Sequence, residues 1–256
     1  MPVTVNTNVY SLAAQKNLTR TQSSLETAVQ RLSSGLRINM AKDDAAGLAI
    51  AQLQTGQARG MTVAQRNIAD GISYLNVADA TLQTVSDMMQ RQRELAVQYS
   101  SGLYTAAQQG YMTTEFTALA TEITAAMARA TFNGTAVFGG GGAIQVGANA
   151  GQTIAITANT ISASAAITDI ASVDTDLNAV AAELANVGSL QSRLDSATRV
   201  AAAIEEAQYA AAGRVMDADF ARETARLTSA QVVQQAGVAA LAQANSLPQL
   251  ALGLLS

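Results

Sequence analysis

A seven-residue spacing of leucines dominates the start of the chain. Leu18, Leu25 and Leu32 stand one heptad apart, and small or polar residues fill the positions between them. Apolar residues at this spacing are typical of a helix that packs along another helix through a narrow seam. The first forty residues therefore predict a long, thinly apolar helix.

A matching stripe runs through the last forty residues. Its predicted seam positions are Leu227, Gln234, Val238 and Leu241. Each stripe is about 35–40 residues long, and single helices of this kind gain most of their stability from packing. The two stripes should therefore pair with each other, with other copies of the chain, or with both. Gln234 is either solvated or part of a packed seam, where polar residues set the register.

Broader apolar stripes fill the region between the two ends. One runs in threes and fours from Ile68 to Leu95 and stops at Ser100-Ser101-Gly102. A second runs from Phe116 to Met127, and a third begins near Ile170 and continues to Ala211. This spacing predicts three further amphipathic helices.

The middle of the chain changes period. Ile144 and Val146 alternate with other residues, as do Ile154 and Ile156, and glycine-rich turns flank them. We expect β-hairpins around residues 132–160. The glycines at 139–142 do not form a phosphate loop, because no Lys-Ser/Thr pair follows them, so we interpret them as a flexible connector.

These patterns predict a mainly α fold: a long helical hairpin or coiled-coil bundle formed by the N- and C-terminal segments together, with a small central β-hairpin region. Composition agrees, since 49% of the 256 residues are hydrophobic but only 4% are aromatic. Alanine favours helix without adding much core volume. Long helices packed side by side suit this composition better than a thick globular core.

Composition also removes several kinds of chemistry. The chain has no Cys and no His, which excludes disulfides, Ser-His-Asp and Cys-His triads and His-based zinc sites. The net charge is −4 with no basic block, so nucleic acid is not an expected partner. No apolar run is long enough for a membrane span. We expect no cofactor, no metal and no enzymatic activity, although carboxylate-only catalysis stays open at this point.

The segment LSSGLRINMAKDDAAGLAIA, residues 32–51, interrupts a helical pattern and then lets it resume. Gly35 and Asn39 are residues that tolerate non-helical turns. The adjacent Asp43 and Asp44 suggest an acidic site, but neighbouring helical residues diverge by about 100°, so capping of a helix start is the better interpretation. Asp217 and Asp219 have the same interpretation at the mirror position.

Longer motifs resemble one family. They are NTNVYSLAAQKNL from Asn6, the segment just quoted, RQRELAVQ from Arg91, FNGT from Phe132 and DADFARETARLTSAQVVQQAGVAALAQAN from Asp217. In this order and at these distances from the ends, they resemble bacterial flagellin. The resemblance covers the chain except for residues 139–168, where the outer domains of longer flagellins are missing.

The resemblance implies a domain organisation. Residues 1–42 and 217–256 correspond to an inner terminal coiled-coil domain, and residues 43–216 to an outer helical domain with β-hairpins around 132–160. Between them lies a spoke that includes Gly35, Asn39, Met40, Asp43 and Asp44. At Met40 the family usually carries Ser or Thr.

The resemblance also implies a function: a structural subunit that self-assembles into the helical flagellar filament for motility. Its partners are then copies of itself, a flagellar export chaperone, the filament cap and hook-associated proteins. Its location is the extracellular flagellum, reached by type III export without a cleaved signal. The alternative is a hook–filament junction protein, which shares the terminal architecture.

One surface implies a further partner. Gln90, Arg91, Leu95 and Glu115 match positions that many flagellins bury between subunits and present to Toll-like receptor 5. Charges on a helix surface are more often simply solvated. We therefore expect an assembly surface here first and a receptor contact second.

Overall fold

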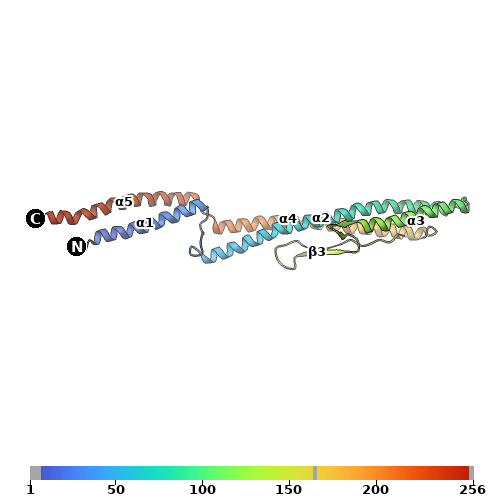
Figure 1. The fold of residues 1–256 in the computed structure, drawn as a ribbon, viewed down its shortest axis with the longest axis horizontal. Helices are drawn as coiled ribbons and strands as arrows, with labels where there is room; N and C mark the ends of the chain where they lie inside the picture. Colours follow the sequence, from blue (N-terminus) through green and yellow to red (C-terminus); the bar gives the residue numbers. More distant parts are fainter. Residues whose placement is uncertain (1–6, 164–165, 254–256) are drawn as a thin grey trace. The chain divides into compact units, whose positions relative to one another are not determined.

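The computed structural model describes residues 7–163 and 166–253, which form five helices and four short strands (Figure 1). The helices are α1 (Val9–Ser34), α2 (Ala45–Tyr99), α3 (Ala106–Arg129), α4 (Ile170–Met216) and α5 (Phe220–Gly253). The strands are β1 (Thr131–Phe132), β2 (Thr135–Ala136), β3 (Gly141–Gln145) and β4 (Thr153–Thr157). The mainly α fold with a small β region is confirmed.

The chain divides into two compact units. The terminal unit comprises residues 1–55 and 209–256, and the central unit comprises residues 56–208. The division falls inside α2 and α4. The domain boundaries that the sequence suggested, after residues 42 and 216, stay a prediction.

In the terminal unit, α1 and α5 lie side by side and antiparallel (Figure 1). Gln22 pairs with Gln234, and Arg31 pairs with Glu223, so the partner number falls as the residue number rises. The N- and C-terminal stripes thus pair with each other, which is one of the arrangements that the sequence predicted.

The core of the central unit lies between α2, α3 and α4. Its large buried side chains include Ile68, Leu75, Leu82, Ile123 and Leu194. These residues belong to the three stripes that the sequence predicted, and all three stripes form helices. A second, smaller cluster around Leu95, Phe116 and Val173 closes the far end of this core.

The strands form two antiparallel hairpins. In the first, Asn133 and Gly134 connect β1 to β2, both with positive φ, as a tight two-residue turn requires. In the second, β3 pairs with β4, with Ile144 opposite Ile154. The glycine run is not simply a connector, because Gly141 and Gly142 belong to β3 and pair with Thr157 and Ile156. A Cβ atom on Gly141 would lie only 2.9 Å from the Ile156 carbonyl oxygen, so this close pairing needs glycine.

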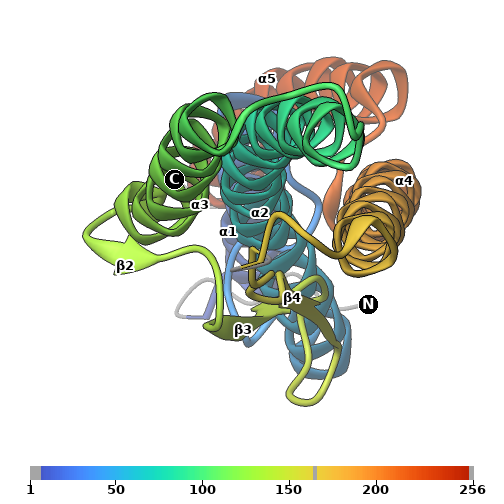
Figure 2. The ribbon, with the colours of Figure 1, turned by 90° about the vertical axis from the view of Figure 1, so that its right-hand side faces the viewer.

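The longer hairpin packs on α2 (Figure 2). The Ile144 side chain fills the space above Gly71, and Ala148 lies against Gly60. The weak hairpin thus gains a helical support, which a two-stranded sheet in water needs.

Among the described residues, no helix combines the length and the apolar character that crossing a lipid bilayer requires.

Candidate functional site

The break that the sequence predicted begins at Gly35, directly after α1. Gly35 adopts a φ of +71°, and its backbone N–H donates to the Arg31 carbonyl at 2.9 Å. Glycine takes this left-handed conformation without a steric penalty, so it ends the helix here. We call residues 35–44, which connect α1 to α2, the spoke.

The spoke is tied to the connection between α4 and α5. Leu36 forms a single antiparallel bridge with Asp217, and the Ala218 N–H donates to the Gly35 carbonyl at 2.9 Å. Arg37 donates twice across the same gap, from its backbone N–H to Met216 and from its guanidinium to Val215. The connection between α1 and α2 and the connection between α4 and α5 therefore stabilise each other through these hydrogen bonds.

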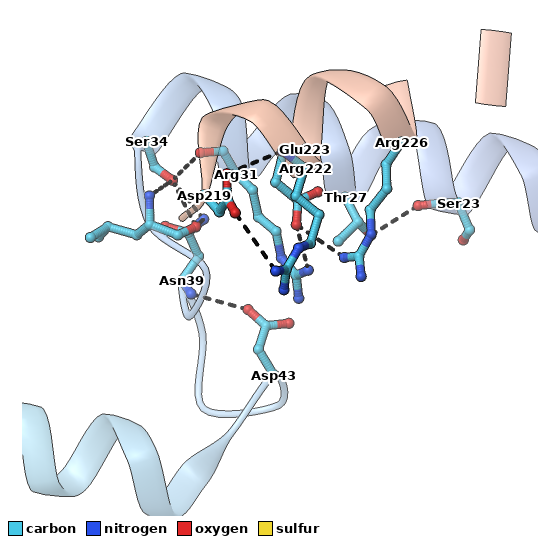
Figure 3. Close-up of polar contacts among 11 residues, drawn as sticks. Ser23, Thr27, Arg31, Ser34, Asn39, Asp43, Asp219, Arg222, Glu223 and Arg226 are labelled. Carbon is cyan, nitrogen blue, oxygen red and sulfur yellow. Dashed lines mark hydrogen bonds and ion pairs between the residues drawn. The ribbon is translucent and has the colours of Figure 1, made fainter. Parts of the chain in front are cut away.

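The Asp43 carboxylate folds the spoke into a loop (Figure 3). Its Oδ2 accepts the backbone N–H groups of Asn39 and Met40, each at 3.1 Å. These two bonds, first that from Met40, hold the pKa of the Asp43 carboxyl below its ordinary value of 3.8. The Asn39 side-chain amide donates in turn to Ser34 Oγ at 2.8 Å. Met40 itself is exposed.

Two of the acidic residues at the junction cap helices, as predicted. Asp44 Oδ1 accepts the Gly47 N–H at 2.8 Å at the start of α2, and Asp219 Oδ1 accepts the Arg222 N–H at 3.2 Å at the start of α5. The capping interpretation is wrong for Asp43, because its carboxylate accepts backbone N–H groups of the loop and none of the first turn of α2. No group of three or more His, Cys, Asp or Glu among the described residues could hold a metal ion.

Sequence analysis missed a buried carboxylate beside the spoke. Glu223, in the first turn of α5, is only 5% exposed and lies 3.3 Å from Arg31 at the end of α1. Arg226 approaches the same Glu223 oxygen to 3.0 Å from the solvent side (Figure 3). Glu223 precedes Leu227 by one helical turn, so its place on the seam was the signal that could have revealed it.

A charged cleft of ≈ 490 Å³ opens around this junction within the terminal unit. Five arginines and five acidic residues line it together with Ile38: Arg31, Arg37, Arg214, Arg222, Arg226, Asp43, Asp44, Asp217, Asp219 and Glu223. The opposite charges balance, and no imidazole or thiol is present in the chain. The arrangement therefore suits a rigid joint more than a reacting centre.

The predicted seam positions have two outcomes. Leu18, Leu25, Leu32, Leu227, Gln234 and Leu241 are half-buried on the α1/α5 seam. The polar Gln234 is accommodated on the seam because its side-chain amide donates a hydrogen bond of 2.7 Å to the side-chain oxygen of Gln22. Val238 does not lie on this seam, since it is 56% exposed. Its neighbour Gly237 faces α1 instead, where a Cβ atom would lie 3.3 Å from Leu18 Cδ1.

The surface predicted on α2 and α3 also needs a correction. Gln90, Arg91 and Glu115 are exposed, and Arg91 pairs with Glu94 and Glu115 at 2.9 Å. These pairs, first that with Glu94, raise the pKa of Arg91. Leu95 is absent from this surface, because its side chain is 2% exposed and packs in the smaller core cluster. Its position continues the buried stripe of α2.

Comparisons with known proteins cover both ends of the chain. Residues 5–143 match the bacterial flagellin N-terminal helical region, and residues 170–255 match the bacterial flagellin C-terminal helical region. Flagellin FlaB2 of Treponema pallidum (strain Nichols) is 33% identical, over 98% of this chain and 99% of its own. The flagellar filament 33 kDa core protein of Treponema phagedenis is 34% identical with the same coverage. A Salmonella muenchen flagellin is 43% identical over 54% of this chain, but over only 27% of its own length.

Proposed function

Because the chain belongs to the bacterial flagellin family, we propose that it is a structural subunit that assembles with copies of itself into a flagellar filament for motility. The family is one of structural proteins, and the two treponemal relatives match this chain over nearly their whole length. This chain therefore spans the same parts of the family as these two relatives.

The paired terminal helices carry the proposal. Large apolar side chains remain on the outside of the α1/α5 pair: Val9, Leu12, Val29, Val232 and Val238 are each at least half exposed. A pair of helices covers only one stripe of each partner, so these side chains remain in water in a single copy. Further copies that cover them would gain the hydrophobic free energy of about 25 cal/mol for each Å² removed from water.

A filament is the expected product when unlike surfaces meet. If one patch of a subunit contacts a different patch on the next, the contact repeats without closing into a pair. Repetition with a small rotation then produces an open helix. The half-buried seam residues from Leu18 to Leu32, together with Leu227, Gln234 and Leu241, would hold each subunit's own helix pair.

The proposal includes no catalytic role, in keeping with the structural family. The alternative of a hook–filament junction protein finds no support, since the relatives named above are flagellins or a filament core protein. Export by the type III route, an extracellular location, and an export chaperone, filament cap and hook-associated proteins as partners complete the proposal.

A receptor contact is a separate part of the proposal. It rests on the exposed group Gln90, Arg91 and Glu115, with Leu95 supporting the surface from beneath. Soluble monomer should activate Toll-like receptor 5, and Arg91→Ala should weaken signalling. Unchanged signalling by the Arg91→Ala monomer would remove this part and leave the filament untouched.

Seeded polymerisation tests the main proposal. Purified full-length chain is mixed with short sheared filaments and followed by electron microscopy, and we expect the seeds to elongate. Chains that lack residues 1–35 or 220–256 should remain unassembled, because each deletion removes one partner of the helix pair. Elongation by either truncated chain, or none by the full chain, would contradict the proposal.

A further inference from the structure

We propose that neighbouring copies contact each other through two different flanks of the α1/α5 pair, with Glu26 of one copy entering a basic groove beside Arg20 and Arg226 of the next. This inference rests on the proposed self-assembly and specifies its geometry. The groove and Glu26 both belong to the terminal unit.

The first flank is a groove of ≈ 510 Å³ between α1 and α5. Arg20, Ser24 and Arg31 line it from α1, and Arg226 and Val233 line it from α5. Its single acidic residue is Glu223, which Arg31 and Arg226 already engage. Three guanidinium groups against one carboxylate leave the groove with an excess of two positive charges.

The second flank carries the one acidic residue of α1. Successive helical residues are about 100° apart, so Ser24 and Glu26 lie on opposite sides of the seam residue Leu25. Because Ser24 lines the groove, Glu26 points to the other flank. Val29, one turn further along, is half exposed on that same flank.

Both charges lack an ionic partner in a single copy. Within residues 7–163 and 166–253, neither Arg20 nor Glu26 forms an ion pair, and Glu26 accepts only a 3.4 Å hydrogen bond from Gln22. A second copy laid beside the first brings the acidic flank against the basic one.

The register allows the pairing over a range of offsets. Arg20 lies six residues, or about 9 Å, from Glu26 along α1. Gln22 pairs with Gln234 and Arg31 with Glu223, which places Arg226 level with residues 28–30, on the other side of Glu26 along the axis. If a neighbouring copy is displaced along the helix axis by no more than these separations, its Glu26 therefore lies close to Arg20 or to Arg226. Val233 in the groove and Val29 on the opposite flank add apolar contact.

Charge reversal in the full-length chain tests the contact. Glu26→Lys and Arg20→Glu should each raise the critical concentration for seeded assembly about tenfold at low salt, since an attraction becomes a repulsion. A 1:1 mixture of the two variants should assemble again, because every contact between unlike copies then joins opposite charges. The double variant Glu26→Lys/Arg20→Glu should also recover.

Lys16→Glu is the matched control for Arg20→Glu, with the same change in charge on the same helix but at a position outside the groove. It should assemble within about twofold of the unmodified chain, and circular dichroism should show equal helix content in all variants. Failure of both the mixture and the double variant to recover, with helix content intact, overturns the inference, as does wild-type assembly by both single variants. If the unmodified chain itself does not elongate seeds, the proposed function fails instead.

Discussion

Asn8 and Ala244 connect the start of α1 to the last turns of α5, because the Asn8 side-chain amide donates a hydrogen bond to the Ala244 carbonyl at 2.8 Å. The Asn8 side-chain oxygen also caps α1 by accepting the Ser11 N–H at 3.1 Å. Within a helix, the residue four positions on would donate to Ala244, but that residue is Pro248, which has no N–H. Asn8 thus supplies the donor that the sequence of α5 cannot.

Asn8→Ala should destabilise the pairing of α1 and α5 by about 1–2 kcal/mol, because it removes both an N-cap and the partner of a carbonyl. Hydrogen exchange of the first turns of α1 measures this loss. Gln15→Ala, on an exposed position of α1, is the control and should have little effect. In a Pro248→Ala background the effect should shrink, since the introduced alanine can donate to the Ala244 carbonyl. An undiminished effect there would show that the carbonyl bond contributes nothing.

Glu223→Gln should cost about 2 kcal/mol, because it leaves the mostly buried Arg31 without its counter-charge. Arg226→Gln should cost about 0.5 kcal/mol, since the Arg226 side chain is 58% exposed. Exchange protection at the end of α1 and the start of α5 reports both changes. Replacing Arg31 and Glu223 together by methionine should restore most of the protection, because no unpaired charge remains buried and Arg226 is free to turn to water. Equal costs for the two single variants would argue against a special role for the buried pair.

Acid should open the spoke through Asp43. The pKa of its carboxyl is lowered in the folded chain, so its contribution to loop stability is complete above the ordinary value of 3.8 and is lost as the pH falls below it. Amide chemical shifts of Asn39 and Met40 should follow this loss. Asp43→Asn should remove the pH dependence of both amides, whereas Asp87→Asn, on α2, should leave it intact. Titration of the two amides at an unshifted pKa would contradict the assignment.

Gly71→Ala should loosen the longer hairpin. The new Cβ atom would lie 2.0 Å from Ile144 Cδ1, so the side chain must move, at a cost of about 1–3 kcal/mol in thermal unfolding of the central unit. Ile144→Val removes that atom and should restore much of the stability to the double variant. Gly56→Ala, in the same helix but with no atom within 4 Å of the new Cβ, should be neutral or stabilising. A loss at Gly56 equal to that at Gly71 would point to helix geometry in place of hairpin packing.

The sequence predicted best where apolar stripes are broad. Residues such as Leu75, Leu82 and Ile123 recur at helical spacing and are large, so a helix and its buried face follow together. It was weakest on the terminal seam, where small residues lie beside valines. There the choice between Gly237 and Val238 depends on how closely the two backbones approach, which a single helix pattern does not contain.

The spoke was predictable only where its residues act on their neighbours in the sequence. Gly35, Asp44 and Asp219 act on their own backbone neighbourhood, and local chemistry identifies such residues. The pair of Arg31 and Glu223 joins positions 192 residues apart, so no local pattern announces it. Leu95 shows the converse, since a resemblance placed it on a surface while its own helical stripe placed it in the core.

Charge is confined to one half of α5. After Arg226 the chain carries no Asp, Glu, Lys or Arg up to its last residue. On α5 itself, ionic strength and acidity can therefore act only on the turns nearest the spoke, while the later turns respond to temperature and to hydrophobic association. The two parts of this one helix thus respond to different conditions, so a change of medium can alter the joint while the later turns of α5 keep their apolar contacts.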